Sequence, residues 1–177
     1  MRFILACLAA LGAPPAAAEP CRLSLALALD VSGSVDWREY RLQAEGLATA
    51  LNDPEVREAL FAMPGAPVAI AVYEWSASQY QRLVQDWVLI EDEAALAALT
   101  DRLTRLQRLP APEPTGLAAA LVYGKDLIAD GPNCWDQTLD VSGDGKNNDW
   151  PTPGQLRARG PLAGLRIDAL VIVQDRD

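Results

Sequence analysis

Residues 23–34 read LSLALALDVSGS, an apolar run that passes directly into an aspartate and two serines. Leucine and alanine fill Leu23 to Leu29 with only Ser24 between them, and such a run predicts a central β-strand covered on both faces. The next segment, Asp30-Val31-Ser32-Gly33-Ser34, places three oxygen-bearing side chains close together. Gly33 lets the backbone bend between them. We therefore expect a buried strand that ends in a polar loop.

A second polar segment of the same kind occurs far along the chain, at Asp140-Val141-Ser142-Gly143-Asp144-Gly145. It closes a strand predicted over Thr138–Ser142. Carboxylates and hydroxyls presented together at strand ends suit a hard cation such as Mg²⁺. In an open α/β sheet the carboxyl ends of the strands meet at one edge, and ligands bind there. A bound metal, and not a side-chain nucleophile, is therefore the expected seat of function.

The remaining hydrophobic pattern alternates strands with helices. Asp36 can cap a helix that runs to Leu51, and Ser76–Gln79 joins two strands as a hairpin. Leucines recur at helical spacing over 92–109, which predicts a long helix there. This alternation indicates an α/β sheet with helices on both faces. The other expected elements are a helix over Glu55–Ala62, strands over Val68–Trp75, Arg82–Ile90 and Leu165–Val173, a helix over Thr115–Ala129, and a polar loop over Gly145–Gly160 with one short helix.

The chain is acidic, with 15 lysines and arginines against 24 aspartates and glutamates in 177 residues, a net charge of −9. Such a surface argues against nucleic acid and anionic membranes as partners. No histidine occurs anywhere in the sequence. This composition excludes a Ser-His-Asp or Cys-His triad and any histidine-ligated zinc or iron site.

The N-terminus has the pattern of a secretory signal peptide over residues 1–18. Arg2 supplies the positive start, a short apolar run follows, and Ala16-Ala17-Ala18 forms a small-residue cleavage site. The alternative is a lipoprotein signal at Ile4-Leu5-Ala6-Cys7, which lacks a preceding apolar run. The expected mature domain is 19–177, periplasmic or secreted, and loss of the one basic residue leaves 14 basic against 24 acidic residues, a net charge of −10. No later stretch is long and apolar enough to span a membrane.

Two cysteines remain in that mature domain, Cys21 and Cys134. In an exported protein a pair of cysteines suggests one disulfide. Cys21 lies nine residues before Asp30, and Cys134 lies ten before Asp144. If the two strands are parallel neighbours, both cysteines lie at the same end of the sheet, as a disulfide requires. The alternative is two unpaired thiols.

Thr115 adds a third part to the two polar segments, because it stands where a proline-rich loop enters a predicted helix. The order Asp-x-Ser-x-Ser, then Thr, then an Asp at a later strand end resembles the metal-ion-dependent adhesion site (MIDAS) of von Willebrand factor type A (VWA) domains. The matching positions are Asp30, Ser32, Ser34, Thr115 and Asp144. Residues 19–177 also resemble a bacterial exported VWA-like family of unknown function, marked here by Cys21, Glu74-Trp75-Ser76 and Ser142-Gly143-Asp144-Gly145.

The resemblance implies a Rossmann-like, mostly parallel sheet and a Mg²⁺ site, although Mn²⁺ and Ca²⁺ also accept oxygen donors. The hydroxyls of Ser32, Ser34 and Thr115 would contact the metal directly or through water. Asp30 and Asp144 would act largely through bound water. Neutral hydroxyls leave the cation under-neutralised, so an acidic residue of a protein partner would complete its shell. The chain would then be a binding module and not an enzyme.

Two other functions fit the same residues. A metal-dependent phosphate or ester hydrolase would use Asp30 or Ser32 as nucleophile beside Mg²⁺, and Lys146 is the sole nearby candidate for a residue that holds a phosphate. A metal that only stabilises the fold is the third interpretation. The second segment, Asp140 to Gly145, also matches the opening of an EF-hand calcium loop, but the twelfth position is Pro151 instead of glutamate.

The sequence departs from the usual VWA pattern in two places. Asp140 occupies a strand position that is apolar in the family, where a carboxylate needs hydrogen bonds, and it is a second candidate for the metal. The sixth strand and final helix of the family are missing after the strand that ends at Val173. We therefore expect either a truncated form or an edge covered by another chain. Glu74-Trp75-Ser76 and Asn147–Trp150 are expected to rim the metal face as a specificity surface.

Overall fold

The computed structural model describes residues 21–160 and 162–171 of the chain. The predicted signal peptide over 1–18, and the last two residues of the strand predicted to end at Val173, lie outside the described residues. Among the helices that are described, none has both the length and the apolar character needed to cross a membrane.

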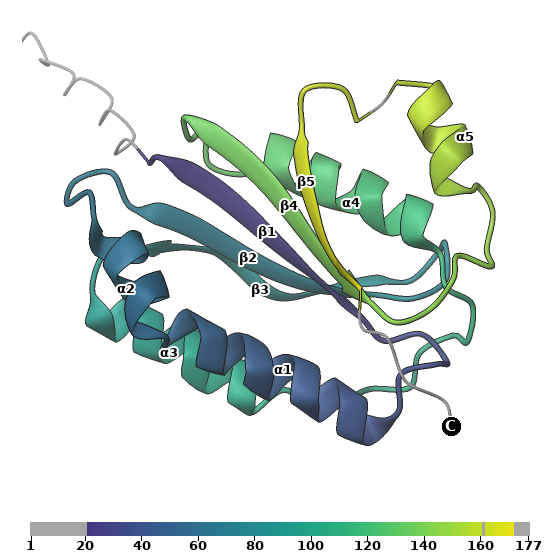
Figure 1. Ribbon diagram of the computed structural model, residues 1–177, viewed down its shortest axis with the longest axis horizontal. Coiled ribbons are helices and arrows are strands. Elements are labelled where there is room, and N and C mark those ends of the chain that lie inside the picture. The colour runs from purple at the N-terminus through teal and green to yellow at the C-terminus, as the bar shows by residue number, and fades with distance from the viewer. Residues whose placement is uncertain (1–20, 161, 172–177) are drawn as a thin grey trace, which may run out of the picture.

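A five-stranded sheet forms the centre of the domain, in the order β3-β2-β1-β4-β5 (Figure 1). Neighbouring strands run parallel except β2 and β3, which form the antiparallel hairpin that the sequence predicts. The leucine-alanine run becomes the middle strand, so the predicted α/β class and mostly parallel sheet are confirmed. The strands are β1 (Leu23–Asp30), β2 (Val68–Trp75), β3 (Gln81–Ile90), β4 (Asp136–Gly143) and β5 (Arg166–Val171).

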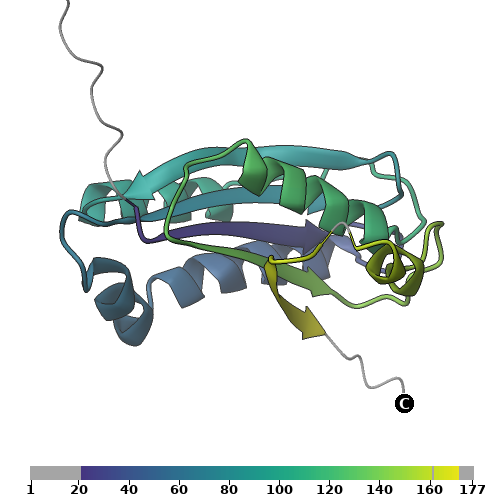
Figure 2. The ribbon, with the colours of Figure 1, turned by 90° about the horizontal axis from the view of Figure 1, so that it is seen from above.

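Helices cover both faces of this sheet (Figure 2). On one face α1, α2 and α3 bury their leucines against the leucines of β1 and the valines and isoleucine of β2 in one apolar core. On the other face α4 packs over Ala26, Tyr73 and Leu139, with α5 adding Leu156 at its margin. The helices are α1 (Trp37–Leu51), α2 (Pro54–Phe61), α3 (Glu93–Thr104), α4 (Leu117–Ala129) and α5 (Pro153–Ala158).

α3 is shorter than the leucine spacing predicts. The expected helix covers 92–109, but the observed one ends at Thr104 and is followed by a proline-rich segment without helix or strand. In that segment the guanidinium of Arg108 donates hydrogen bonds to the carbonyl oxygens of Val31 (3.2 Å) and Ser32 (3.4 Å). These long-range bonds hold the chain against the loop after β1. These contacts override the helical preference of the leucine pattern. The prolines that follow also disfavour helix.

The disulfide predicted between Cys21 and Cys134 is present, with Cα atoms 4.6 Å apart. It joins the entries of β1 and β4, two parallel neighbours. The carboxyl ends of the parallel strands meet at the other edge, where Asp30 of β1 is in register with Trp75 of β2. The covalent bond and the polar strand ends therefore lie at opposite edges of the sheet.

Candidate metal centre

The candidate site begins where β1 ends, at Asp30. The backbone N–H of Ser32 donates to Asp30 Oδ1 over 2.8 Å, which turns the chain directly after the strand. The side-chain amide of Gln43 donates to the Asp30 carbonyl over 3.2 Å, and the N–H of Gly33 donates to the Glu113 carbonyl over 2.9 Å. Contacts from α1 and from the loop before α4 thus fix the Asp-x-Ser-x-Ser loop in place.

Hydrogen bonds link the hydroxyls of two segments of the chain to the carboxylate of a third. Thr115 Oγ1 donates to Ser32 Oγ over 3.2 Å, and Ser32 Oγ lies 3.3 Å from Ser34 Oγ. Ser34 Oγ in turn donates to Asp144 Oδ1 over 2.6 Å. The carboxyl group of Asp30 is close enough to Asp144 for their charges to interact. The structure therefore brings all five residues of the predicted metal site together.

One oxygen of Asp30 is left without a partner. The side chain is fully buried, and among the described residues Oδ2 makes no hydrogen bond, although the backbone N–H of Asp144 lies close enough to the carboxyl group to favour its charged form. A Cβ placed on Gly143 would come within 3.1 Å of this oxygen, so the end of β4 passes closely over it. Burial raises the pKa of Asp30 to about 6, against the hydrogen bond from Ser32, and the Asp144 charge adds to the rise. An unpaired buried carboxylate oxygen is costly, and a cation is a group that would satisfy it.

The backbone of Gly145 passes close to the hydroxyls of Ser34 and Thr115. A Cβ there would stand 3.1 Å from both Ser34 Oγ and Thr115 Oγ1. A side chain at residue 145 would therefore push these two hydroxyls aside by a few tenths of an ångström, so glycine is the residue that leaves the cluster undisturbed.

Thr115 is held by the loop after β4. Its N–H donates to Asn148 Oδ1 over 2.7 Å, and its carbonyl accepts from the N–H of Asn148 over 3.1 Å. The next residue, Gly116, donates its N–H to the Ser76 carbonyl over 2.7 Å. Because these backbone groups are engaged by other segments, α4 begins at Leu117, two residues later than predicted.

Asp149 extends the same contact to the hairpin between β2 and β3. Its Oδ2 accepts from the N–H of Ser78 over 2.7 Å and its Oδ1 from the N–H of Trp150 over 2.8 Å. These hydrogen bonds lower the pKa of Asp149. The sequence places this loop only at the rim of the site. Thr115, the partner of Asn148 in this loop, lies 33 residues earlier in the chain, so no local sequence pattern indicates the contact.

Glu74, Trp75 and Ser76 do not form the exposed rim that the sequence suggests. Their exposures are 1%, 1% and 0%. Glu74 accepts hydrogen bonds from Tyr40 Oη over 2.6 Å and from the guanidinium of Arg82 over 2.6 and 3.0 Å. The prediction was wrong because β2 lies inside the sheet, between β1 and β3, and is buried up to its last residue.

Asp140 takes no part in the hydroxyl cluster. It lies within β4, which is extended and in register with both β1 and β5, so Asp140 to Gly145 does not form a calcium loop of the EF-hand type. Across the part of the chain that the structure describes, no group of three or more acidic or cysteine side chains is arranged to hold a metal. A cation at this site would therefore depend on the hydroxyls.

The sheet order and the helices on both faces are those of a VWA domain, and solved structures agree. A von Willebrand factor type A protein from Catenulispora acidiphila is similar over 85% of this chain, with a TM-score of 0.59 and 20% identity. Proximal thread matrix protein 1 from the mussel byssus, in a structure described as having a zinc-occupied MIDAS motif, is similar over 88%, with a TM-score of 0.66 and 12% identity. The present chain spans 33% and 39% of those two chains.

The family can be stated more narrowly. The family model described as "Protein of unknown function (DUF1194)" matches residues 20–177, so the chain belongs to this VWA-like family. Among curated proteins, none matches the sequence significantly.

Proposed function

We propose that this protein binds a divalent cation and, through it, an acidic residue of a protein partner. The residues that would hold the metal are Asp30, Ser32, Ser34, Thr115 and Asp144. The proposed cation is Mg²⁺, with Mn²⁺ and Ca²⁺ as the alternatives that accept the same oxygen donors. The observation that carries the proposal is the buried Asp30 oxygen that makes no hydrogen bond within the part of the chain the structure describes, beside three hydroxyls linked through Ser32. Carboxylates and hydroxyls are the hard donors that such cations need. The zinc-occupied MIDAS motif of the mussel protein supports a metal in this fold.

The accessibility of the site supports a ligand from outside. Asp30, Ser32 and Thr115 are buried, whereas Ser34 is exposed and Asp144 is half-buried. A cation held mainly by neutral hydroxyls and water keeps an uncompensated positive field on its open side. A carboxylate of a partner is the natural group to occupy that side. The protein would then act by binding and not by catalysis.

Export of the mature domain, residues 19–177, belongs to the same proposal. The Cys21–Cys134 disulfide supports a periplasmic or secreted protein, because disulfides persist in oxidising compartments. An exported binding module would meet its partner outside the cytoplasm.

Calorimetric titration with magnesium chloride tests the metal site. We expect saturable binding that weakens about tenfold or more in Asp144→Asn, since groups that act on a metal through water contribute on that scale. Asp140→Asn is the matched control, because it makes the same chemical change earlier in the same segment, within β4 and outside the hydroxyl cluster. Circular dichroism establishes that both variants are folded. Equal losses in the two variants, or no saturable binding, would contradict the metal site.

Affinity capture tests the partner. The immobilised protein should retain a partner in magnesium, release it on chelation, and retain it again when magnesium returns, whereas Asp30→Asn should retain none. Replacing the acidic residues of that partner one at a time should identify a single carboxylate that is essential. If the partner stays bound when the metal is chelated, binding through a metal is refuted. Asp30-dependent turnover of phosphate or ester substrates would favour the hydrolase instead.

A further inference from the structure

A buried ionic group lies close to the metal centre and has no role in the proposed function. Its centre is Glu74, the last residue but one of β2, which is 1% exposed. Tyr40 of α1 donates to its Oε1 over 2.6 Å, and the guanidinium of Arg82 on β3 donates to its Oε2 over 2.6 and 3.0 Å. Tyr40 is 2% exposed, whereas the side chain of Arg82 is 33% exposed. Both carboxylate oxygens of Glu74 are therefore satisfied by the protein itself.

Stability alone does not explain this buried charge. Glu74 lies on the same face of β2 as Val72, a residue of the apolar core that α1 and α3 cover. The cost of removing a carboxylate from water can exceed what its ion pair returns, and an apolar residue of similar volume often serves stability as well. An apolar residue cannot, however, form a directional hydrogen bond with Tyr40. The buried carboxylate therefore indicates that the position of α1 has to be fixed.

Tyr40 connects Glu74 to the loop after β1. It lies near the start of α1, and it belongs to one buried cluster with Val31 and Val35. These two valines flank residues 32–34, the segment that carries two of the proposed ligands. Burial raises the pKa of Tyr40, and the hydrogen bond to Glu74 raises it further, so the hydroxyl remains a donor. The side chain of Tyr40 therefore supports the loop from below while Glu74 holds the tyrosine.

The same helix contacts the metal centre a second time, through Gln43. This residue follows Tyr40 by three positions, a spacing that places both side chains on the same side of a helix. Its amide donates to the Asp30 carbonyl over 3.2 Å, and its oxygen accepts from Ser142 Oγ over 3.2 Å. A shift of α1 would therefore disturb the ends of both β1 and β4.

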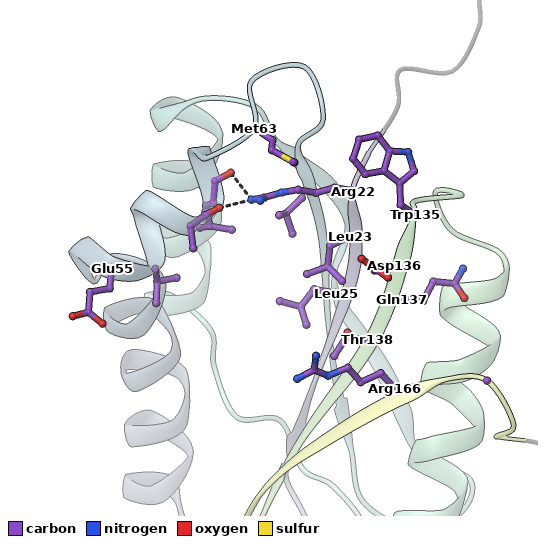
Figure 3. A pocket seen from close by; sticks show the side chains of 15 residues that line it. Arg22, Leu23, Leu25, Glu55, Met63, Trp135, Asp136, Gln137, Thr138 and Arg166 are labelled. Atoms are coloured by element: carbon purple, nitrogen blue, oxygen red, sulfur yellow. Dashed lines mark hydrogen bonds between the residues drawn. The ribbon is translucent and has the colours of Figure 1, made fainter.

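The opposite edge of the sheet shows a helix that is anchored in a different way. Arg22 precedes β1 directly and is half-buried. Figure 3 shows its guanidinium reaching to α2, where it donates to the carbonyl oxygens of Ala59 and Leu60, the latter over 3.0 Å. This anchor uses neutral acceptors and lies at the edge that the disulfide closes. The anchor with a fully buried carboxylate lies instead at the edge where the proposed ligands have to be placed.

We propose that Glu74 is a positioning residue of the metal centre: through Tyr40 it holds the start of α1, and α1 holds the loop that carries Ser32 and Ser34. This inference rests on the proposed metal site. Arg82 is in register with Glu74 on the neighbouring strand and binds its second oxygen, which leaves the first oxygen for Tyr40. Loss of the Tyr40–Glu74 hydrogen bond should therefore loosen the loop more than it loosens the rest of the sheet.

Amide hydrogen exchange in the metal-free protein tests the positioning directly. Tyr40→Phe removes one hydroxyl and keeps the ring, and the loop amides should then exchange about tenfold faster or more, relative to amides within β2. Tyr73→Phe is the matched control, because it removes a similarly buried hydroxyl that donates to the Ala120 carbonyl on the other face of the sheet. It should leave the relative rates unchanged. The reporters are three hydrogen-bonded N–H groups of the loop, those of Val31, Gly33 and Val35.

Calorimetry with magnesium chloride connects this network to the metal. Tyr40→Phe should weaken magnesium affinity at least about threefold, and Tyr73→Phe should not. The double variant Tyr40→Phe, Glu74→Met separates position from stability, because it replaces both hydrogen-bonding groups by apolar ones of similar shape. Arg82 can then turn its charge to water. We expect the double variant to unfold at higher urea concentration than Tyr40→Phe, while its magnesium affinity stays weakened.

Two results would overturn the positioning role. The first is a Tyr40→Phe variant whose loop amides exchange as they do in Tyr73→Phe. The second is a double variant that recovers both stability and full magnesium affinity, because the network would then only stabilise the fold. If the unchanged protein binds no magnesium, the metal centre itself is contradicted, and the exchange rates still decide whether Tyr40 and Glu74 hold the loop.

Discussion

Two glycines in helix interiors experience opposite surroundings. Gly124 of α4 faces the sheet, and a Cβ there would lie 2.6 Å from Tyr73 Oη and 2.7 Å from Leu139 Cδ1. Tyr73 is fully buried and donates to the Ala120 carbonyl over 2.7 Å, so it has no room to move away. Gly46 of α1 has no atom within 4 Å of such a Cβ. α4 therefore packs on the sheet at a distance that only glycine permits, and this packing sets where its N-terminal end lies.

Alanine substitution should separate these two glycines. Gly124→Ala is expected to lower the free energy of unfolding by about 1–3 kcal/mol through overpacking. Gly46→Ala, the control with the same chemistry, should leave it unchanged or raise it by up to about 1 kcal/mol, because alanine favours helix. Urea unfolding followed by circular dichroism measures both. A Gly124→Ala variant as stable as Gly46→Ala would show that α4 does not lie so close to the sheet.

The strands could be predicted from sequence more accurately than the helix ends. β1 and β2 are continuous apolar runs because both faces of a central strand are covered, and this pattern is local. The end of α3 depends on Arg108, whose guanidinium donates to a carbonyl 76 residues away. The spacing of leucines in the sequence cannot indicate such a long-range hydrogen bond. The buried position of Glu74 likewise depends on Tyr40 and Arg82, which belong to other elements.

The same distinction applies to the candidate site. Its five oxygen-bearing residues could be predicted together, because a spaced motif and strand ends are visible in sequence and the strand order brings those ends to one edge. The groups that position them could not. Asn148 was assigned to the rim, yet in the structure it engages both backbone groups of Thr115. Loop contacts of this kind are set by the folded arrangement of two elements.

The loop after β4 therefore makes a prediction of its own. Asn148→Ala removes the acceptor for the Thr115 N–H, so the threonine hydroxyl should lose its fixed position and magnesium affinity should fall about tenfold or more. Asn133→Ala, an exposed asparagine near the disulfide, is the matched control and should leave the affinity unchanged. Calorimetry measures both variants. Unchanged affinity in Asn148→Ala would mean that Thr115 is positioned by α4 alone.

At the scale of the whole molecule, the disulfide and the hydroxyl cluster lie at opposite ends of the central strands. The Cys21–Cys134 bond closes the edge where β1 and β4 begin, and it packs with Ala69 in a small apolar cluster. The hydroxyl cluster lies at the edge where those strands end. Because the strands between the two edges are held along their full length by backbone pairing, a change at one edge should alter stability without moving the other.

Removal of the disulfide tests this independence. The bond closes a sequence separation of 113 residues, for which the chain-entropy model gives a stabilisation of about 4–5 kcal/mol. The double variant Cys21→Ala, Cys134→Ala should lose stability on that scale in urea unfolding. Under conditions where it remains folded, its magnesium affinity should equal that of the unchanged protein, since no ligand of the site touches the disulfide. A folded double variant with weakened magnesium binding would show instead that the two edges are coupled through β1 and β4, and the hydroxyl cluster would then owe its geometry to a covalent bond a full strand length away.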